Sequence, residues 1–109
     1  MKKFNVIYTD NFERELKRLS KKHRSIKKDL NGLFSQLENN PQHGTPLGKN
    51  CYKIRLAITS KGKGKSGGAR VITHVFVSDK LVYLLSIYDK SGKDDISDKE
   101  VQRLLNLIK

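Results

Sequence analysis

The chain has 109 residues, of which 23 are lysine or arginine and 11 are aspartate or glutamate, so its formal net charge at pH 7 is +12. This length suits a single domain, and so large a positive charge predicts a polyanionic partner such as nucleic acid. The single cysteine excludes an intrachain disulfide, and the lack of a long apolar run argues against a signal peptide or a membrane helix, so we expect a cytoplasmic protein.

The N-terminal part of the sequence predicts one strand and two helices. Residues 4–8 alternate between the two faces of a strand, and Thr9 and Asp10 have side chains suited to a helix N-cap. Apolar residues then recur at helical spacing up to about residue 39, with a turn near residues 23–25. Two amphipathic helices with a short link predict an antiparallel helical hairpin. The Asn, Pro and Gly residues between positions 39 and 48 predict a loop.

The central part of the sequence predicts three strands. Residues 51–58 alternate, with basic side chains on the face opposite to the apolar ones. A connection rich in glycine and lysine follows, and residues 70–77 and 81–88 then predict a hairpin that is buried on both faces. Because apolar residues share the parity of Arg70, the alternation leaves open the face on which this arginine lies.

The C-terminal part predicts a final helix. Ser97 and Glu100 have the spacing of a capping box, and apolar residues recur behind them at helical spacing. We therefore expect one domain over residues 1–109 with the element order β-α-α-β-β-β-α.

The histidines and the cysteine form no metal-binding or catalytic pattern. His23, in the turn between the helices, and His43, in the loop, are expected to be exposed, whereas His74 is expected to be a hydrogen-bonded structural side chain. Cys51 begins an apolar strand, which favours a packing role over that of a nucleophile. Because the sequence has no spaced cluster of His, Asp or Glu, we expect no metal and no cofactor.

The positive charge is concentrated in the middle of the chain. Between Glu38 and Asp79 there is no acidic residue. The basic residues of this stretch are Lys49, Lys53, Arg55, Lys61, Lys63, Lys65 and Arg70. Uncompensated cations repel one another, and an extended polyphosphate would relieve that repulsion and release counterions. The glycines among the lysines leave two interpretations open, a mobile soluble loop or a loop whose amides approach phosphate oxygens.

Three stretches of the sequence are typical of one toxin family. The strings KIRL at residues 53–56, KGKGKSGGARVI at 61–72 and LLSIYDK at 84–90 resemble the HigB-like branch of the RelE/ParE superfamily. The resemblance implies a RelE-like α+β fold, in which the N-terminal strand and the helical hairpin pack on a mainly antiparallel four-stranded sheet that is followed by a C-terminal helix. It also implies the toxin of a type II toxin–antitoxin system. RelE- and HigB-like members cleave mRNA in the ribosomal A site without a metal.

The resemblance also implies which residues act. The implied catalytic residues are Lys53, Arg55, Arg70, Tyr88 and Lys90, and the implied RNA-binding residues are Lys49, Lys61, Lys63 and Lys65. Arg55 and Arg70 would hold the scissile phosphate, because a guanidinium stays charged and binds two oxygens. Tyr88 would stack on a base or orient the attacking hydroxyl. For the base, Lys53, Lys90 and the neighbouring carboxylate Asp89 stay open, although Asp89 also suits a turn cap.

Three functions follow from these features, and each has its own partners. The first is an endoribonuclease, or mRNA interferase, which would act on mRNA and the ribosome and inhibit translation. A cognate antitoxin protein would neutralise it, and the pair would contact operator DNA through the antitoxin. A ParE-like toxin would instead poison DNA gyrase. A non-catalytic RNA- or ribosome-binding module would bind rRNA with a steep salt dependence and make no cut.

Overall fold

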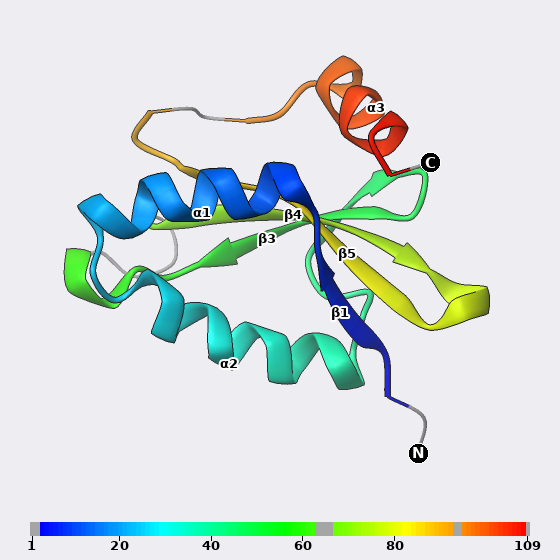
Figure 1. The fold of residues 1–109 in the computed structure, drawn as a ribbon, viewed down its shortest axis with the longest axis horizontal. Helices are drawn as coiled ribbons and strands as arrows, with labels where there is room; N and C mark the ends of the chain where they lie inside the picture. The colour runs from blue at the N-terminus through cyan, green and yellow to red at the C-terminus, as the bar shows by residue number, and fades with distance from the viewer. Residues whose placement is uncertain (1–2, 63–66, 93–94, 109) are drawn as a thin grey trace.

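The computed structural model describes residues 3–62, 67–92 and 95–108, which contain three α-helices and five strands (Figure 1). The first elements are β1 (Asn5–Tyr8), α1 (Asp10–Lys22) and α2 (Ile26–Asn39). They are followed by β2 (Thr45–Gly48), β3 (Cys51–Leu56), β4 (Ala69–Phe76), β5 (Leu81–Asp89) and α3 (Asp98–Asn106), with short 3-10 turns η1 at Thr59–Lys61 and η2 at Val77–Asp79. The predicted α+β order is confirmed, apart from one additional strand.

The additional strand, β2, lies in the stretch that the sequence predicts to be a loop. It occupies one edge of the sheet and pairs antiparallel with the first half of β3. An edge strand tolerates Pro46, and positive φ angles at Gly48, Lys49 and Asn50 turn the chain back into β3. The prediction of a loop was wrong because a short edge strand takes its order from the neighbouring strand and not from its own pattern.

The strands are arranged in the order β1-β5-β4-β3-β2, with β1 parallel to β5 and the other neighbours antiparallel. A register shift between β4 and β5 marks a bulge. Because of this shift, Leu84 and Ile87 face one core, whereas Leu85 and Tyr88 face the other. Because both faces of β5 are buried, its sequence is apolar at odd and even positions alike, as predicted, and the bulge reverses which parity faces which core.

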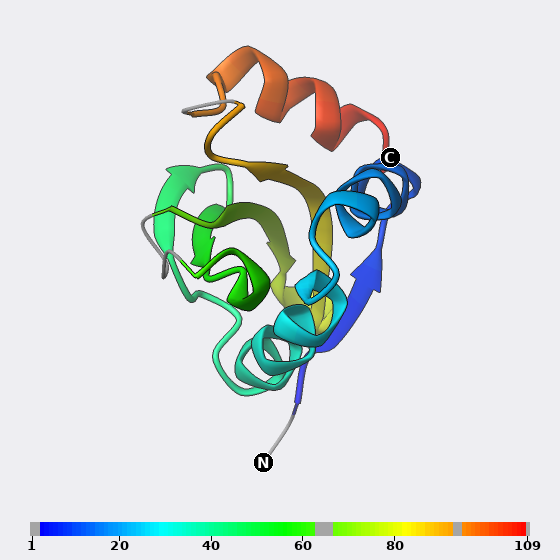
Figure 2. The ribbon, with the colours of Figure 1, turned by 90° about the vertical axis from the view of Figure 1, so that its left-hand side faces the viewer.

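Helices cover both faces of the sheet, and the figures show them on opposite sides of a strongly curved layer (Figures 1 and 2). The apolar stripes of α1 and α2 pack on one face, and α3 packs on the other, where Val101 and Leu104 meet Ile72 and Leu85. Burial of these stripes stabilises the fold by about 25 cal/mol per Å² of apolar surface. None of the helices in the described ranges is long and apolar enough to cross a membrane.

The predicted helix starts are confirmed by their caps. The Thr9 side chain accepts a hydrogen bond from the Phe12 amide at the start of α1, and the Ser97 hydroxyl accepts one from the Glu100 amide at the start of α3. Each cap satisfies an amide that has no partner within the helix.

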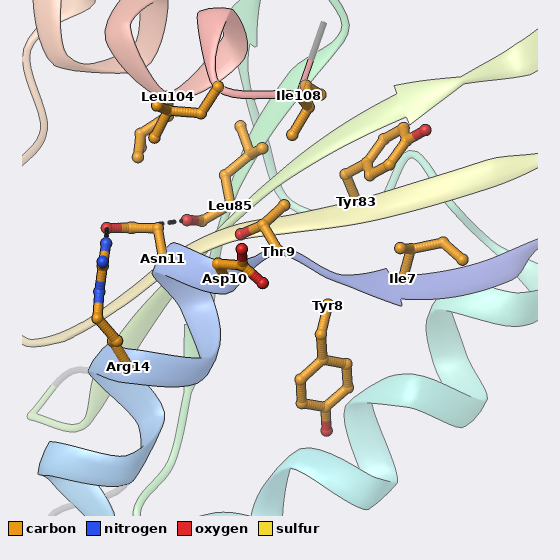
Figure 3. A pocket seen from close by; sticks show the side chains of 11 residues that line it. Ile7, Tyr8, Thr9, Asp10, Asn11, Arg14, Tyr83, Leu85, Leu104 and Ile108 are labelled. Carbon is orange, nitrogen blue, oxygen red and sulfur yellow. Dashed lines mark hydrogen bonds between the residues drawn. The ribbon is translucent and has the colours of Figure 1, made fainter.

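Side chains at the start of α1 continue the hydrogen bonding that β1 begins along β5. The Thr9 hydroxyl donates to the Leu84 carbonyl at 2.8 Å. The Asn11 amide donates to the Leu85 carbonyl at 2.9 Å, as Figure 3 shows. The Glu15 carboxylate accepts from the Ser86 hydroxyl at 2.7 Å. These side-chain hydrogen bonds therefore stabilise the edge of β5 at residues 84–86, where its pairing with β1 ends.

Candidate active site

One row of side chains crosses three neighbouring strands on the face of the sheet that carries α3. Arg55 of β3 lies opposite Arg70 of β4, and Arg70 lies opposite Tyr88 of β5. Residues in register on adjacent strands project from the same face, and three strands about 4.8 Å apart make a row roughly 10 Å long. The structure thus brings together Arg55, Arg70 and Tyr88, which we call the arginine row, and it settles the face on which Arg70 lies.

Two members of the arginine row are nearly buried, and the third is exposed. Arg70 is 4% and Tyr88 7% exposed, whereas Arg55, on the outermost of the three strands, is open to solvent. An Arg70 N–H donates to the Ala69 carbonyl at 3.1 Å. Arg55 forms no ion pair with any residue in the described ranges. Arg55 is therefore the member of the row that is most accessible from solvent.

The phenol of Tyr88 is protonated at neutral pH. Burial raises the pKa of Tyr88 to about 12, the nearby charge of Asp95 also raises it, and Arg70 lowers it. A protonated phenol can donate a hydrogen bond or a proton to an oxygen, but it does not take up a proton as a base. The arginine row combines two positive charges with one proton donor.

Lys53 lies on the same face of β3, two residues before Arg55, and an acidic residue neutralises it. Its ammonium is 3.0 Å from the Asp95 carboxylate, which belongs to the segment that leads into α3. The hydrogen bond from Lys53 holds the pKa of Asp95 below its usual value. Asp95 is 64% exposed, and such pairs contribute about 0–1 kcal/mol, so a phosphate can displace it. Asp95 is not among the predicted site residues, since only the tertiary structure places it beside a lysine.

Asp89, at the end of β5, is held by several donors at once. Its carboxylate accepts from Lys61 at 2.9 Å, from the Ser91 amide at 2.9 Å and from His23 at 2.8 Å. Burial alone raises the pKa of Asp89, but these hydrogen bonds outweigh it and hold the pKa well below its usual value. Asp89 is thus a turn cap and an ion-pair partner, as one of the two sequence interpretations proposes, and its lone pairs are engaged.

The prediction that His23 is exposed was wrong. Its side chain is only 15% exposed because it lies against Asp89, which is 66 residues further along the chain. Lys61, a predicted RNA-binding residue, is also drawn to this carboxylate. The predicted exposure of His43 was also wrong, because its ring is half-buried. Nothing in the local sequence indicates these contacts, since the residues involved meet only in the folded sheet.

The remaining predicted residues lie in three different places. Lys90 directly follows β5, and its amide donates to the Gly68 carbonyl at 3.1 Å, so it lies beside the end of the arginine row. Lys49 lies beyond the other end of β3, where its ammonium bonds to Gln102 of α3. Lys63 and Lys65 lie outside the described residues.

The residues that the sequence assigns to structural roles lie away from the arginine row. Cys51 is buried, and burial raises the pKa of its thiol to about 11. Its sulfur is 3.6 Å from the His74 ring, whose pKa burial lowers. No group of three or more potential metal ligands occurs in the part of the chain that the structure describes.

A separate groove of about 420 Å³ lies between β1, the start of α1 and α3 (Figure 3). Its lining is mainly apolar and includes Ile7, Tyr83, Leu85 and Leu104. None of the predicted site residues lines this groove, so it is distinct from the arginine row.

The fold is that of the small α+β toxins of toxin–antitoxin systems. It is similar to the Escherichia coli toxin RelE, a double mutant in the free state, with a TM-score of 0.64 and 19% identity over 93% of this chain and 97% of that one. It is also similar to a chain of the intact E. coli RelBE toxin–antitoxin complex, with a TM-score of 0.62 and 18% identity over 79% of this chain and 95% of that one. A third similar structure is the RelBE2 toxin–antitoxin complex of Mycobacterium tuberculosis, with a TM-score of 0.61 and 19% identity over 82% of this chain and 93% of that one.

A sequence model of the family described as the RelE toxin of the RelE/RelB toxin–antitoxin system matches residues 8–109. The chain belongs to this family, and it is a toxin of a type II toxin–antitoxin system. Its place in the HigB-like branch stays a prediction.

Proposed function

We propose that this toxin is a metal-independent endoribonuclease that cleaves mRNA on the ribosome and thereby inhibits translation in the cytoplasm. The observation that carries the proposal is the register of Arg55, Arg70 and Tyr88 across three strands. Two guanidinium groups beside a protonated phenol suit a phosphodiester, because the charges stabilise a crowded anionic phosphorus and the phenol supplies a proton.

The reaction would be an attack of a ribose 2′-hydroxyl on the adjacent phosphorus. The 2′-oxygen forms a bond to phosphorus, the bond to the 5′-oxygen breaks, and a 2′,3′-cyclic phosphate remains. Arg55 and Arg70 neutralise the phosphorane, and Tyr88 gives its proton to the leaving 5′-oxygen. The proton of the 2′-hydroxyl passes to Lys53 or Lys90, whichever of the two acts as a neutral amine.

The free protein holds this site partly closed. Tyr88 packs with Ile96, which precedes α3, and with Val101 of α3. Asp95 forms an ion pair with Lys53. Substrate must displace this exposed ion pair before it reaches the buried arginine. Such a site depends on another body to position its substrate, which is the role that we assign to the ribosome.

Cleavage of mRNA in a reconstituted translation reaction tests the proposal. We expect wild-type toxin to produce new 3′ ends inside codons, and Arg55→Ala to slow their appearance by at least about 100-fold. Arg103→Ala is the matched control, because Arg103 is an exposed arginine of α3, distant from the row in sequence and 3.9 Å from Glu100. Intact mRNA with stalled, cleaved gyrase–DNA complexes would instead identify a gyrase poison, and rRNA binding without cleavage would identify a binding module.

We further propose that a cognate antitoxin neutralises the toxin by covering the arginine row with an acidic segment, and that the pair contacts operator DNA through the antitoxin. The net charge of +12 supports an acidic partner. The similar structures include RelE bound to a peptide of the antitoxin RelB, in which the antitoxin segment is the partner of that toxin.

A further inference from the structure

A small polar pocket adjoins the outer end of the arginine row. It has a volume of about 230 Å³ and lies at the edge of β3, between α2 and the loop that precedes β2. Its lining residues include Asp29, Gly32, Gln36, His43 and Arg55. Arg55 therefore belongs both to the row and to this edge pocket.

Gly32 leaves this edge pocket open at a cost to the helix. It lies in the interior of α2, where glycine is less favourable than alanine by about 1 kcal/mol. A Cβ at this position would meet no atom within 4 Å, and the residue has no positive φ, so neither packing nor backbone conformation requires glycine. A larger side chain at this position would project into the space that the pocket occupies.

The polar groups on the pocket wall are of two kinds. The Gln36 amide and the His43 ring form no side-chain hydrogen bond with any residue in the described ranges, so both can bind a ligand. Asp29 is already engaged, because it accepts from the Thr59 amide at 2.9 Å and from the Ser25 hydroxyl at 2.9 Å. The hydrogen bonds from Thr59 and Ser25 outweigh burial and hold the pKa of Asp29 below its usual value, so the wall carries a negative charge.

The negative charge of Asp29 disfavours a phosphate in this pocket, in addition to the one proposed to lie on Arg55. The unpaired amide of Gln36 and the imidazole of His43 suit the edge of a flat heterocycle. We propose that the edge pocket receives one nucleobase of the RNA whose phosphate lies on Arg55. This inference rests on the proposed function and adds a base-binding subsite to it. The subsite would discriminate among bases through hydrogen bonds to Gln36 and His43.

Binding of short RNA to the full-length protein tests this subsite without ribosomes. The probes are fluorescein-labelled single-stranded hexamers of A, C or U, and an abasic ribose-phosphate hexamer of equal charge. Fluorescence anisotropy at fixed salt gives each affinity. We expect wild type to prefer at least one base-bearing hexamer over the abasic one by about tenfold, the effect of one well-placed base.

Gly32→Leu is the decisive variant because leucine favours a helix and fills the pocket. We expect it to melt no lower than wild type, to bind the abasic hexamer within about twofold of wild type, and to lose the preference for a base. Ser35→Leu is the matched control, since Ser35 is an exposed residue of α2 outside the pocket, and it should keep the preference.

Two results would overturn the subsite. The first is a preference for base-bearing hexamers that survives in Gly32→Leu. The second is wild-type protein that binds no hexamer, or binds base-bearing and abasic hexamers equally well. Cleavage in the translation reaction is measured separately. A failure of cleavage with an intact base preference refutes the nuclease and leaves the subsite standing.

Discussion

Arg55 and Arg70 lie directly opposite each other in the β3–β4 ladder, so two like charges face one another on one side of the sheet. Like charges in register destabilise an antiparallel pair by a few tenths of a kcal/mol to about 1 kcal/mol. Helical ion pairs are not available to strand residues, and Arg55 has no acidic partner in the described ranges. Under the proposed function, a phosphate bound between the two arginines would relieve this repulsion.

Arg55→Gln should separate stability from function. Removal of the repulsion should raise the free energy of unfolding by about 0.2–1 kcal/mol, while mRNA cleavage falls by about 100-fold or more. Urea denaturation and the translation assay measure the two quantities. A variant that loses both stability and cleavage would show that Arg55 has a structural role.

Tyr88→Phe should lower cleavage with little change in the fold. The ring keeps its packing in the α3 core, but the proton donor is lost, which should slow the chemical step by about 10²–10⁴-fold. Because the pKa of Tyr88 is raised to about 12, the wild-type rate should show no loss attributable to this group up to pH 10. Single-turnover rates from pH 6 to 10 provide the measurement, and a variant as fast as wild type would remove Tyr88 from the mechanism.

Asp89→Asn should destabilise the protein at neutral pH. The change removes the negative charge and leaves one acceptor oxygen in place of the two that bind Lys61 and His23, at an expected cost of about 1–3 kcal/mol. The pKa of Asp89 is lowered on folding, so its contribution is present above the unfolded value near 4 and is lost progressively as the pH falls toward the folded value.

Urea denaturation at pH 7 and at pH 3 checks this prediction. The difference between wild type and Asp89→Asn should shrink at the lower pH. Asp79→Asn, a change at an exposed aspartate in η2, serves as the control and should show little difference at either pH. An effect of Asp89→Asn that is equal at both pH values would contradict an electrostatic origin.

Asp95→Asn should tighten RNA binding. It frees Lys53 from its ion pair and removes a negative charge that lies close to Tyr88, so the affinity for a short single-stranded RNA should rise severalfold at low salt. The gain should disappear as salt increases, because screening weakens exposed charges. Anisotropy titrations over a salt series test this, with Asp98→Asn as a control for net charge. Equal gains in the two variants would mean that only net charge matters.

Much of the fold follows from local sequence. The strand at β1, the helical hairpin and the final helix are predicted from periodicity and caps, and Thr9 and Ser97 cap their helices as expected. The prediction failed at β2, an edge strand of only four residues that contains Pro46 and Gly48. Its hydrogen bonds are made with β3, so no local sequence pattern predicts this strand.

The site divides in the same way. The concentration of lysine and arginine between Glu38 and Asp79 can be read from the sequence. The sequence also shows the alternation that places Lys53 and Arg55 on one face of β3, and the periodicity of the helices. The alignment of Arg55 with Arg70 and Tyr88 depends on the register of three strands. The contacts of Asp89 with His23 and of Asp95 with Lys53 join residues far apart in the chain. Periodicity and capping depend on neighbours within a few residues, whereas register, burial and ion pairs arise only when the whole sheet assembles.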